Sequence, residues 1–157
     1  MAEQDRKSVN RDDVIDVLEK LIETCRDSQN GFREAAEHVK DSDLRAFFNE
    51  QSLERARFAG QLENEVTRLG KSDVDRKGSA TAAMHRAWID LKSNLGGGDK
   101  MILSSVEAGE DNAKKHYEEA LRHKLPEDIL GIVRQQAQSV FAAHDQAKLL
   151  RDRRRAA

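Results

Sequence analysis

The feature that most constrains this sequence is the spacing of its apolar residues, which alternates between three and four positions over long stretches. Such an alternation places the apolar side chains on one face of an α-helix, as in the seams of helical bundles. Because the pattern recurs in four long stretches, the sequence predicts an all-α fold. The face of the first stretch contains Val14, Leu18, Leu21, Cys25, Ser28, Phe32, Ala35 and Val39.

The residues that flank the first two stretches predict where these helices begin and end. Asn10 is the expected N-cap of a helix that runs to about Lys40, because its side chain can accept a hydrogen bond from the first turn. After a short turn, Ser42 is the expected N-cap of a second helix, and Gly70 is its expected stop. The two helices should therefore form an antiparallel hairpin.

The second half of the chain predicts another hairpin. Asp99 is the expected N-cap of a third long helix, and Pro126 fits the first turn of a fourth. The long connection before Asp99 contains a shorter amphipathic helix over residues 79–95, with Trp88 on its apolar stripe, which should lie outside the bundle. Short, long and short connections predict an up-down-down-up four-helix bundle.

Length and composition are consistent with one helical domain. The chain has 157 residues, a single proline and 36% charged residues, which favours long helices with solvated faces. We expect a flexible N-terminus over residues 1–9 and one domain over residues 10–155. The net charge of -2 predicts neither a nucleic-acid nor a membrane partner. The segment "MAEQDRKSVN" contains no apolar stretch resembling a signal peptide, so we expect a soluble, cytoplasmic protein.

Polar residues interrupt the apolar faces in the middle third of the predicted bundle. Counting residues from the two turns places Arg55 of the second helix within about one turn of Glu110 of the third. A charged side chain inside a bundle is costly unless it is paired or bound to a metal ion. The predicted polar layer contains Ser28, Gln51, Arg55, Glu110, Gln136 and His144.

Two interpretations of this layer remain open. In the first, Arg55 donates two hydrogen bonds to Glu110, and the pair needs no metal. In the second, Glu107, Glu110 and His144 bind iron or another divalent metal, with Glu50 or Glu54 as further ligands. An arginine at the site opposes a divalent cation, so the ion pair is the preferred interpretation. Cys25, the only cysteine, is expected to be a small buried residue rather than a reactive thiol.

Several stretches resemble a bacterial ferritin-like family of four-helix bundles known as a domain of unknown function. The stretches that carry this resemblance are "LIETCRDSQNGFREAAEHVKD", "MHRAWIDLKSNLGGGDKMIL", "EAGEDNAKKHYEEAL" and "AAHDQAKLLRD". More distantly, the chain is similar to the rubrerythrin and ferritin bundles, whose midpoint layer binds two irons. The resemblance therefore implies a ferritin-like bundle.

The same resemblance indicates a degenerate metal site. It implies that Glu110 and His144 match ligand positions of the di-iron bundles, whereas Arg55 and Phe58 stand in place of a Glu-x-x-His pair. Ala113 and Phe141 likewise replace expected carboxylates. Only two ligand positions are kept.

Two functional hypotheses follow. The first is a non-catalytic bundle without a cofactor, which acts through its surface as a self-associating or stress-associated binding protein. The second is a metal-dependent oxidoreductase that uses Glu107, Glu110 and His144. Bound metal in the purified protein would separate them.

Overall fold

The computed structural model describes residues 10–72 and 82–156, and all of its regular structure in these ranges is helical. Residues 1–9 of the expected N-terminal segment, and residues 73–81, lie outside this description. The prediction of an all-α fold is therefore confirmed. The helices are α2 (Arg11–His38), α3 (Ser42–Arg68), α4 (Ala82–Asn94), α5 (Asp99–Arg122) and α6 (Glu127–Ala156).

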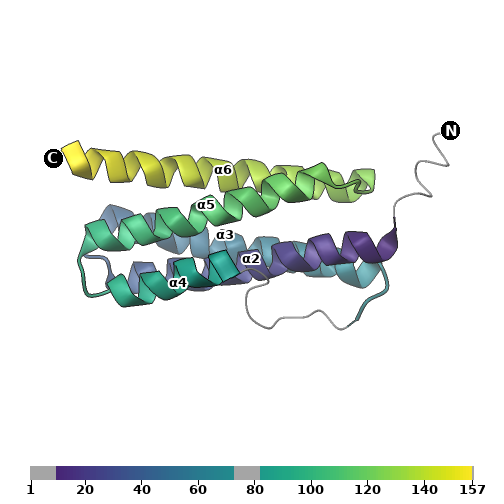
Figure 1. Cartoon of the computed structure of the whole chain (residues 1–157), viewed down its shortest axis with the longest axis horizontal. Helices are drawn as coiled ribbons and strands as arrows, with labels where there is room; N and C mark the ends of the chain where they lie inside the picture. Colours follow the sequence, from purple (N-terminus) through teal and green to yellow (C-terminus); the bar gives the residue numbers. More distant parts are fainter. Residues whose placement is uncertain (1–9, 73–81, 157) are drawn as a thin grey trace.

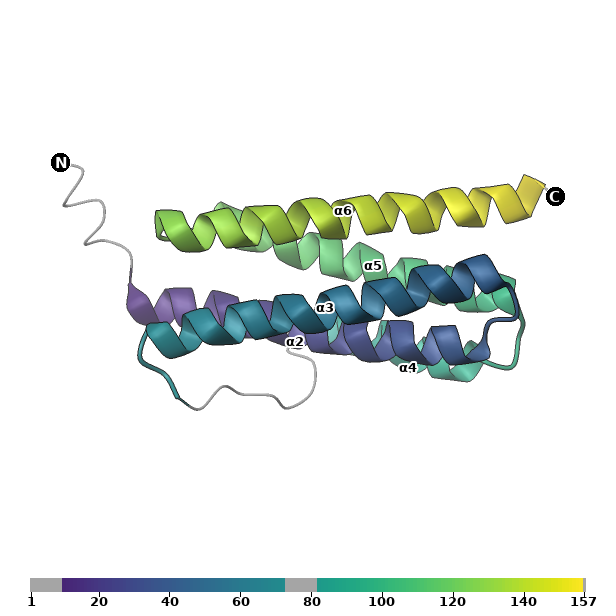
Figure 2. The ribbon, with the colours of Figure 1, turned by 180° about the vertical axis from the view of Figure 1, so that it is seen from behind.

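The four long helices lie side by side, and α4 lies outside them against α2 and α5 (Figure 1). Helices α2 and α6 run in one direction, whereas α3 and α5 run in the other, as both views of the ribbon show (Figures 1 and 2). The α2/α3 turn and the connection between α4 and α5 are therefore at the same end of the molecule. Within the described ranges, none of the helices contains a stretch apolar enough to cross a lipid bilayer.

The structure confirms one of the predicted N-caps and corrects two others. Asn10 caps α2 by accepting a hydrogen bond from the Asp12 amide at 2.9 Å. The N-cap of α3 is Asp41 rather than Ser42, because the Asp41 carboxylate accepts from two amides of the first turn. Asp99 does not cap α5 either: the N-cap is Gly98, which makes no side-chain cap hydrogen bond.

The Asp99 carboxylate instead binds the turn between α2 and α3. Its two oxygens accept from the amides of Lys40 and Asp41 at 2.8 and 2.9 Å. Arg154, near the end of α6, donates to the Asp41 carboxylate at 2.8 Å. One short turn is thus connected to the beginning of α5 and to the end of α6.

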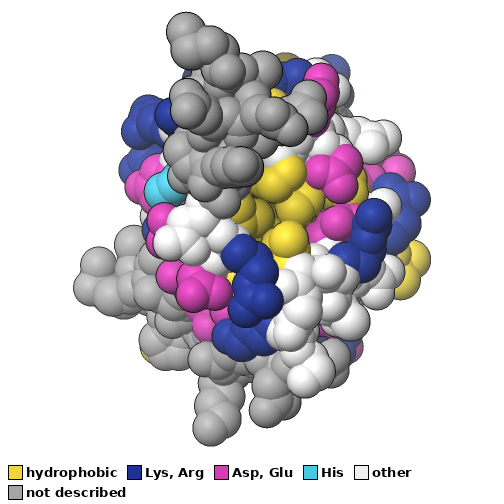
Figure 3. Space-filling model, turned by 90° about the vertical axis from the view of Figure 1, so that its right-hand side faces the viewer, with side chains coloured by type: hydrophobic (Ala, Val, Ile, Leu, Met, Phe, Trp, Pro, Cys, Tyr) yellow, Lys and Arg dark blue, Asp and Glu magenta, His cyan; other side chains and the backbone are white. Residues whose placement is uncertain are grey.

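The apolar faces predicted from the sequence form the core. Residues from α2, α3, α5 and α6 make one cluster of buried side chains, and Leu69 and Leu150 are only partly buried at its ends. At the end where α2 begins, hydrophobic side chains are visible in the middle of the surface and are surrounded by charged ones (Figure 3). The core therefore reaches the surface at this end of the bundle.

Trp88 anchors α4 to the rest of the molecule, as the sequence predicts. Only 9% of the residue is exposed, and its ring centroid lies 6.2 Å from that of Phe32. The ring lies against two glycines, Gly31 of α2 and Gly109 of α5. A Cβ atom at Gly109 would be 2.6 Å from Trp88 Cζ2, and one at Gly31 would overlap the same ring. Only glycine at both positions gives the indole this close approach to both helices.

Candidate functional site: the buried polar layer

Glu110 faces an arginine in the centre of the molecule. The Nη1 and Nη2 atoms of Arg55 donate to Oε1 and Oε2 of Glu110 at 2.9 and 2.8 Å. The Glu110 side chain is fully buried, and 1% of the Arg55 side chain is exposed. The contact expected from counting residues along α3 and α5 is thus present as a bidentate ion pair.

The charge on Arg55 is maintained by its partner. Burial disfavours the charged guanidinium, but the negative charge of Glu110 and the hydrogen bonds to it outweigh this effect and raise the pKa of Arg55 above its ordinary value. The guanidinium also lies over the ring of Phe32, 5.3 Å from its centroid. Phe32 therefore neighbours both Trp88 and the ion pair.

A second polar network crosses all four long helices. The Tyr117 hydroxyl on α5 donates to Gln136 Oε1 on α6 at 2.9 Å, and it lies 3.0 Å from the sulfur of Cys25 on α2. Because the phenolic proton is directed to Gln136, the thiol is the donor to the Tyr117 oxygen. Gln136 Nε2 then donates to the Phe58 carbonyl and to Gln61 Oε1, both on α3.

Burial keeps this second network protonated. It raises the pKa of Cys25 to about 11. Burial also raises the pKa of Tyr117 well above its ordinary value. A protonated thiol is a poor nucleophile and a poor metal ligand, so Cys25 is suited to hydrogen bonding. The polar residues at Cys25, Tyr117 and Gln136 connect helices rather than forming an open reaction site.

His144 lies outside the layer in which the sequence places it. Its Nε2 atom contacts the carboxylate of Asp111, and its Nδ1 atom lies 3.2 Å from Asp145 Oδ1. Successive residues of a helix point about 100° apart, so Asp111 is directed toward α6 while Glu110 faces α3. His144 is therefore part of a surface cluster at the α5/α6 interface.

The other proposed metal ligands also have separate partners. Glu107 forms an ion pair with Arg151 of α6. Glu50 is exposed, and Glu54 lies 3.9 Å from Arg57 in an ion pair along α3. The structure thus places Glu107, Glu110 and His144 in three different sets of contacts.

Among the described residues, a different group has the spacing of metal ligands. Glu34, Glu37 and His38 offer ligand atoms that all lie within 4.8 Å of one another, near the end of α2. Glu37 and His38 are exposed. The ring of His38 is also hydrogen-bonded through Nδ1 to the Glu34 carbonyl, a common contact at the end of a helix. The group is a surface feature, separate from the polar layer.

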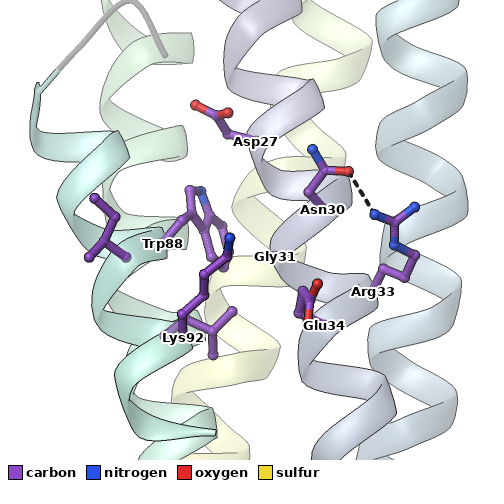
Figure 4. Close-up of a pocket in the computed structure, with 9 residues that line it drawn as sticks. Asp27, Asn30, Gly31, Arg33, Glu34, Trp88 and Lys92 are labelled. Carbon is purple, nitrogen blue, oxygen red and sulfur yellow. Dashed lines mark hydrogen bonds between the residues drawn. The ribbon is translucent and has the colours of Figure 1, made fainter. Parts of the chain in front are cut away.

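The interface between α2 and α4 contains a hollow of about 280 Å³ beside Trp88 (Figure 4). Charged side chains of both signs line it, including Asp27 and Glu34 from α2 and Lys92 from α4. The hollow lies just below the roughly 300 Å³ at which most ligand pockets begin. Helix α4 also makes fewer contacts with α2 than with α5.

Sequence reasoning identified the ion pair but missed the second network and the two glycines beside Trp88. Cys25 is buried as the sequence predicts, but its hydrogen-bond partner lies 92 residues away, so helical spacing does not reveal that partner. The sequence does contain a sign of the Trp88 site, because Gly31 and Gly109 both lie inside helices. A glycine inside a helix weakens the helix unless another group approaches its backbone closely.

The comparison with protein families defines the class of this all-helical molecule. Residues 13–123 match the model of a domain of unknown function, DUF2383. This match extends from the first turn of α2 to the end of α5 and includes both partners of the buried ion pair. The chain therefore belongs to the DUF2383 family. No curated protein matches the chain in a direct comparison.

Proposed function

We propose that this protein is a ferritin-like, up-down-down-up helical bundle that functions by binding a partner rather than by catalysis. The partner is another protein or a second copy of the chain. The parallel course of α3 and α5 and the long connection that contains α4 support the ferritin-like arrangement (Figures 1 and 2).

The observation that carries the non-catalytic proposal is the buried ion pair. Both oxygens of Glu110 accept from Arg55, so the carboxylate at the centre of the bundle is already occupied by a cation. A metal ion at this place would have to displace the guanidinium and leave it buried without a counter-charge, at a cost of several kcal/mol. The layer thus has the properties of a structural element.

Metal chemistry can be tested directly on the purified protein. We expect plasma mass spectrometry to find no stoichiometric transition metal, and Fe²⁺ added under air to oxidise at the rate seen without protein. Glu107→Gln and His144→Gln should not change that rate. Both variants leave the Arg55 and Glu110 pair intact, and Glu127→Gln is a matched control on an exposed carboxylate outside every candidate ligand set.

The opposite result would support the alternative of a metal-dependent oxidoreductase. Stoichiometric iron in the native protein, or iron oxidation that is lost in both Glu107→Gln and His144→Gln, would overturn the proposal.

Sedimentation velocity separates the two kinds of partner, another protein or a second copy of the chain, because self-association makes the sedimentation coefficient depend on protein concentration.

A further inference from the structure

Three buried polar atoms beside the ion pair make no hydrogen bond within the described part of the chain. They are Ser28 Oγ on α2, and Gln51 Oε1 and Arg55 Nε on α3. Their residues are 0%, 9% and 1% exposed. Leaving a buried polar group without a partner costs about 1 to 3 kcal/mol, so three such groups in one region of a native core need an explanation.

The register of α2 and α3 places the three residues close together along the helix axes, within a span of about 6 Å. Ser52 donates to the Gln29 carbonyl at 2.9 Å, which fixes these two residues opposite each other. In an antiparallel pair, Ser28 is then level with position 53 of α3. Gln51 and Arg55 are two positions away on either side, or about 3 Å along the axis. Ser28 therefore lies between the levels of the other two side chains.

The chemistry of the three atoms restricts what can bind to all of them. Arg55 Nε is a donor, Gln51 Oε1 is an acceptor, and the Ser28 hydroxyl can act as either. An anion would meet the Gln51 oxygen and the nearby Glu110 carboxylate, whereas a cation would meet the guanidinium. A neutral molecule that both donates and accepts hydrogen bonds satisfies all three, and the full burial of Ser28 requires it to be very small.

We propose that one water molecule is a permanent part of this core, bound to Arg55 Nε, Gln51 Oε1 and Ser28 Oγ. Buried waters in globular proteins typically make about three hydrogen bonds to groups that would otherwise have no partner. The water accepts from Arg55 Nε and donates to Gln51 Oε1. The Ser28 hydroxyl completes its coordination. The guanidinium is then held by Glu110 through its two Nη atoms and by water through Nε.

The proposal is tested first on the native chain. A crystal structure in which ordered waters are resolved should show one water at about 2.7 to 3.2 Å from Arg55 Nε and from at least one of the other two atoms. In solution, the Arg55 Nε proton should show a nuclear Overhauser effect to a long-lived water. Direct bonding among the three side chains, or an anomalous scattering peak from a metal, would overturn the proposal.

Two variants then test the protein partners of the water. In the double variant Ser28→Ala with Gln51→Met, both partners other than Arg55 are removed, so the Overhauser effect at Arg55 Nε should disappear. The matched control is Ser104→Ala with Gln135→Met, on exposed positions of α5 and α6, which should keep the effect. An effect that persists in the core double variant contradicts the assigned site. If that variant does not fold, the measurements on the native chain still decide.

Discussion

At the scale of single residues, burying the charges of Arg55 and Glu110 disfavours folding, and the folded state tolerates this only when both partners are present. Removing Arg55 and Glu110 from water costs several kcal/mol per ion, and their mutual attraction offsets this only because the contact is bidentate. The interior of the bundle is thus highly sensitive to the loss of either charge and much less sensitive to the loss of both.

We predict that Arg55→Met and Glu110→Leu each destabilise the protein by on the order of 3 to 5 kcal/mol, because each leaves the other partner buried without its counter-charge. The double apolar replacement Arg55→Met with Glu110→Leu should recover much of this loss. Urea unfolding of the four proteins provides a double-mutant cycle that measures the coupling. Single variants with unchanged unfolding midpoints would show that the pair contributes no such coupling.

A single residue, His116, makes the stability of the folded state depend on pH. Thr24 donates its hydroxyl proton to the Lys20 carbonyl, so its oxygen accepts from His116 Nδ1 at 2.8 Å. Burial, followed by the charge of Lys20, lowers the pKa of His116 below its ordinary value of 6.5. The folded state therefore binds this proton less readily than the unfolded state.

Neutral His116 contributes to the free energy of unfolding. This contribution is fully present above pH 6.5 and is lost as the pH falls toward the lowered pKa of the folded state. We expect His116→Gln to flatten the dependence of the thermal midpoint on pH just below 6.5. His123→Gln, at an exposed position, serves as the control and should leave the dependence unchanged. If the thermal midpoint changed with pH equally in His116→Gln and in the native protein, His116 would not be the source of the pH dependence.

At the scale of elements, α4 depends on a single aromatic anchor. Trp88 contacts both α2 and α5, and Asn94 Nδ2 donates to the Ser105 hydroxyl at 2.8 Å near the other end of the helix. The hollow beside Trp88 leaves few further contacts between α4 and α2. The position of this helix should therefore respond strongly to small changes around the indole.

Gly109→Ala tests the anchor from the side of α5. The new methyl group would overlap the Trp88 ring, so we expect displacement of the indole, a red shift of tryptophan fluorescence and a lower thermal midpoint. Gly131→Ala is the matched control, because a Cβ atom there meets nothing within 4 Å. It should be neutral or stabilise α6 by up to about 1 kcal/mol. A Gly109→Ala protein that behaves like the control would show that the indole is not held in this place.

Trp88→Ala removes the anchor itself. Loss of a buried tryptophan of this kind should destabilise the fold by roughly 3 to 5 kcal/mol, because the space between the two glycines cannot collapse completely. Thermal unfolding followed by circular dichroism measures the effect. An unchanged midpoint would mean that α4 contributes nothing to the stability of the remaining helices.

At the scale of the whole molecule, Asp99 connects parts that are distant in sequence. Asp99→Ala removes two charge-assisted hydrogen bonds to backbone amides and should cost about 1 to 3 kcal/mol. Hydrogen exchange at the Lys40 and Asp41 amides should become faster, whereas the exposed Asp90→Ala should have no such effect. Unchanged exchange at these two amides would argue against the contact.

The features that could be predicted from the sequence are those that depend on residues close together in the chain. Helical periodicity is local, so the helices and their buried faces were predictable from spacing alone. Counting from the turns was enough to pair Arg55 with Glu110, because both side chains are long and lie on facing rows. It failed for His144, where an error of one residue moves a side chain by about 100° around its helix. The Trp88 site depends on three helices and could not be deduced from one row.

The two short turns have a kinetic consequence. Each joins neighbouring antiparallel helices, so most contacts of the α2/α3 pair and the α5/α6 pair close small loops and can form early. Asp99 meets Lys40 across 59 positions, and Cys25 meets Tyr117 across 92. These long-range contacts should form after the transition state. Asp99→Ala should therefore accelerate unfolding while leaving the folding rate nearly unchanged, which a denaturant chevron plot would resolve.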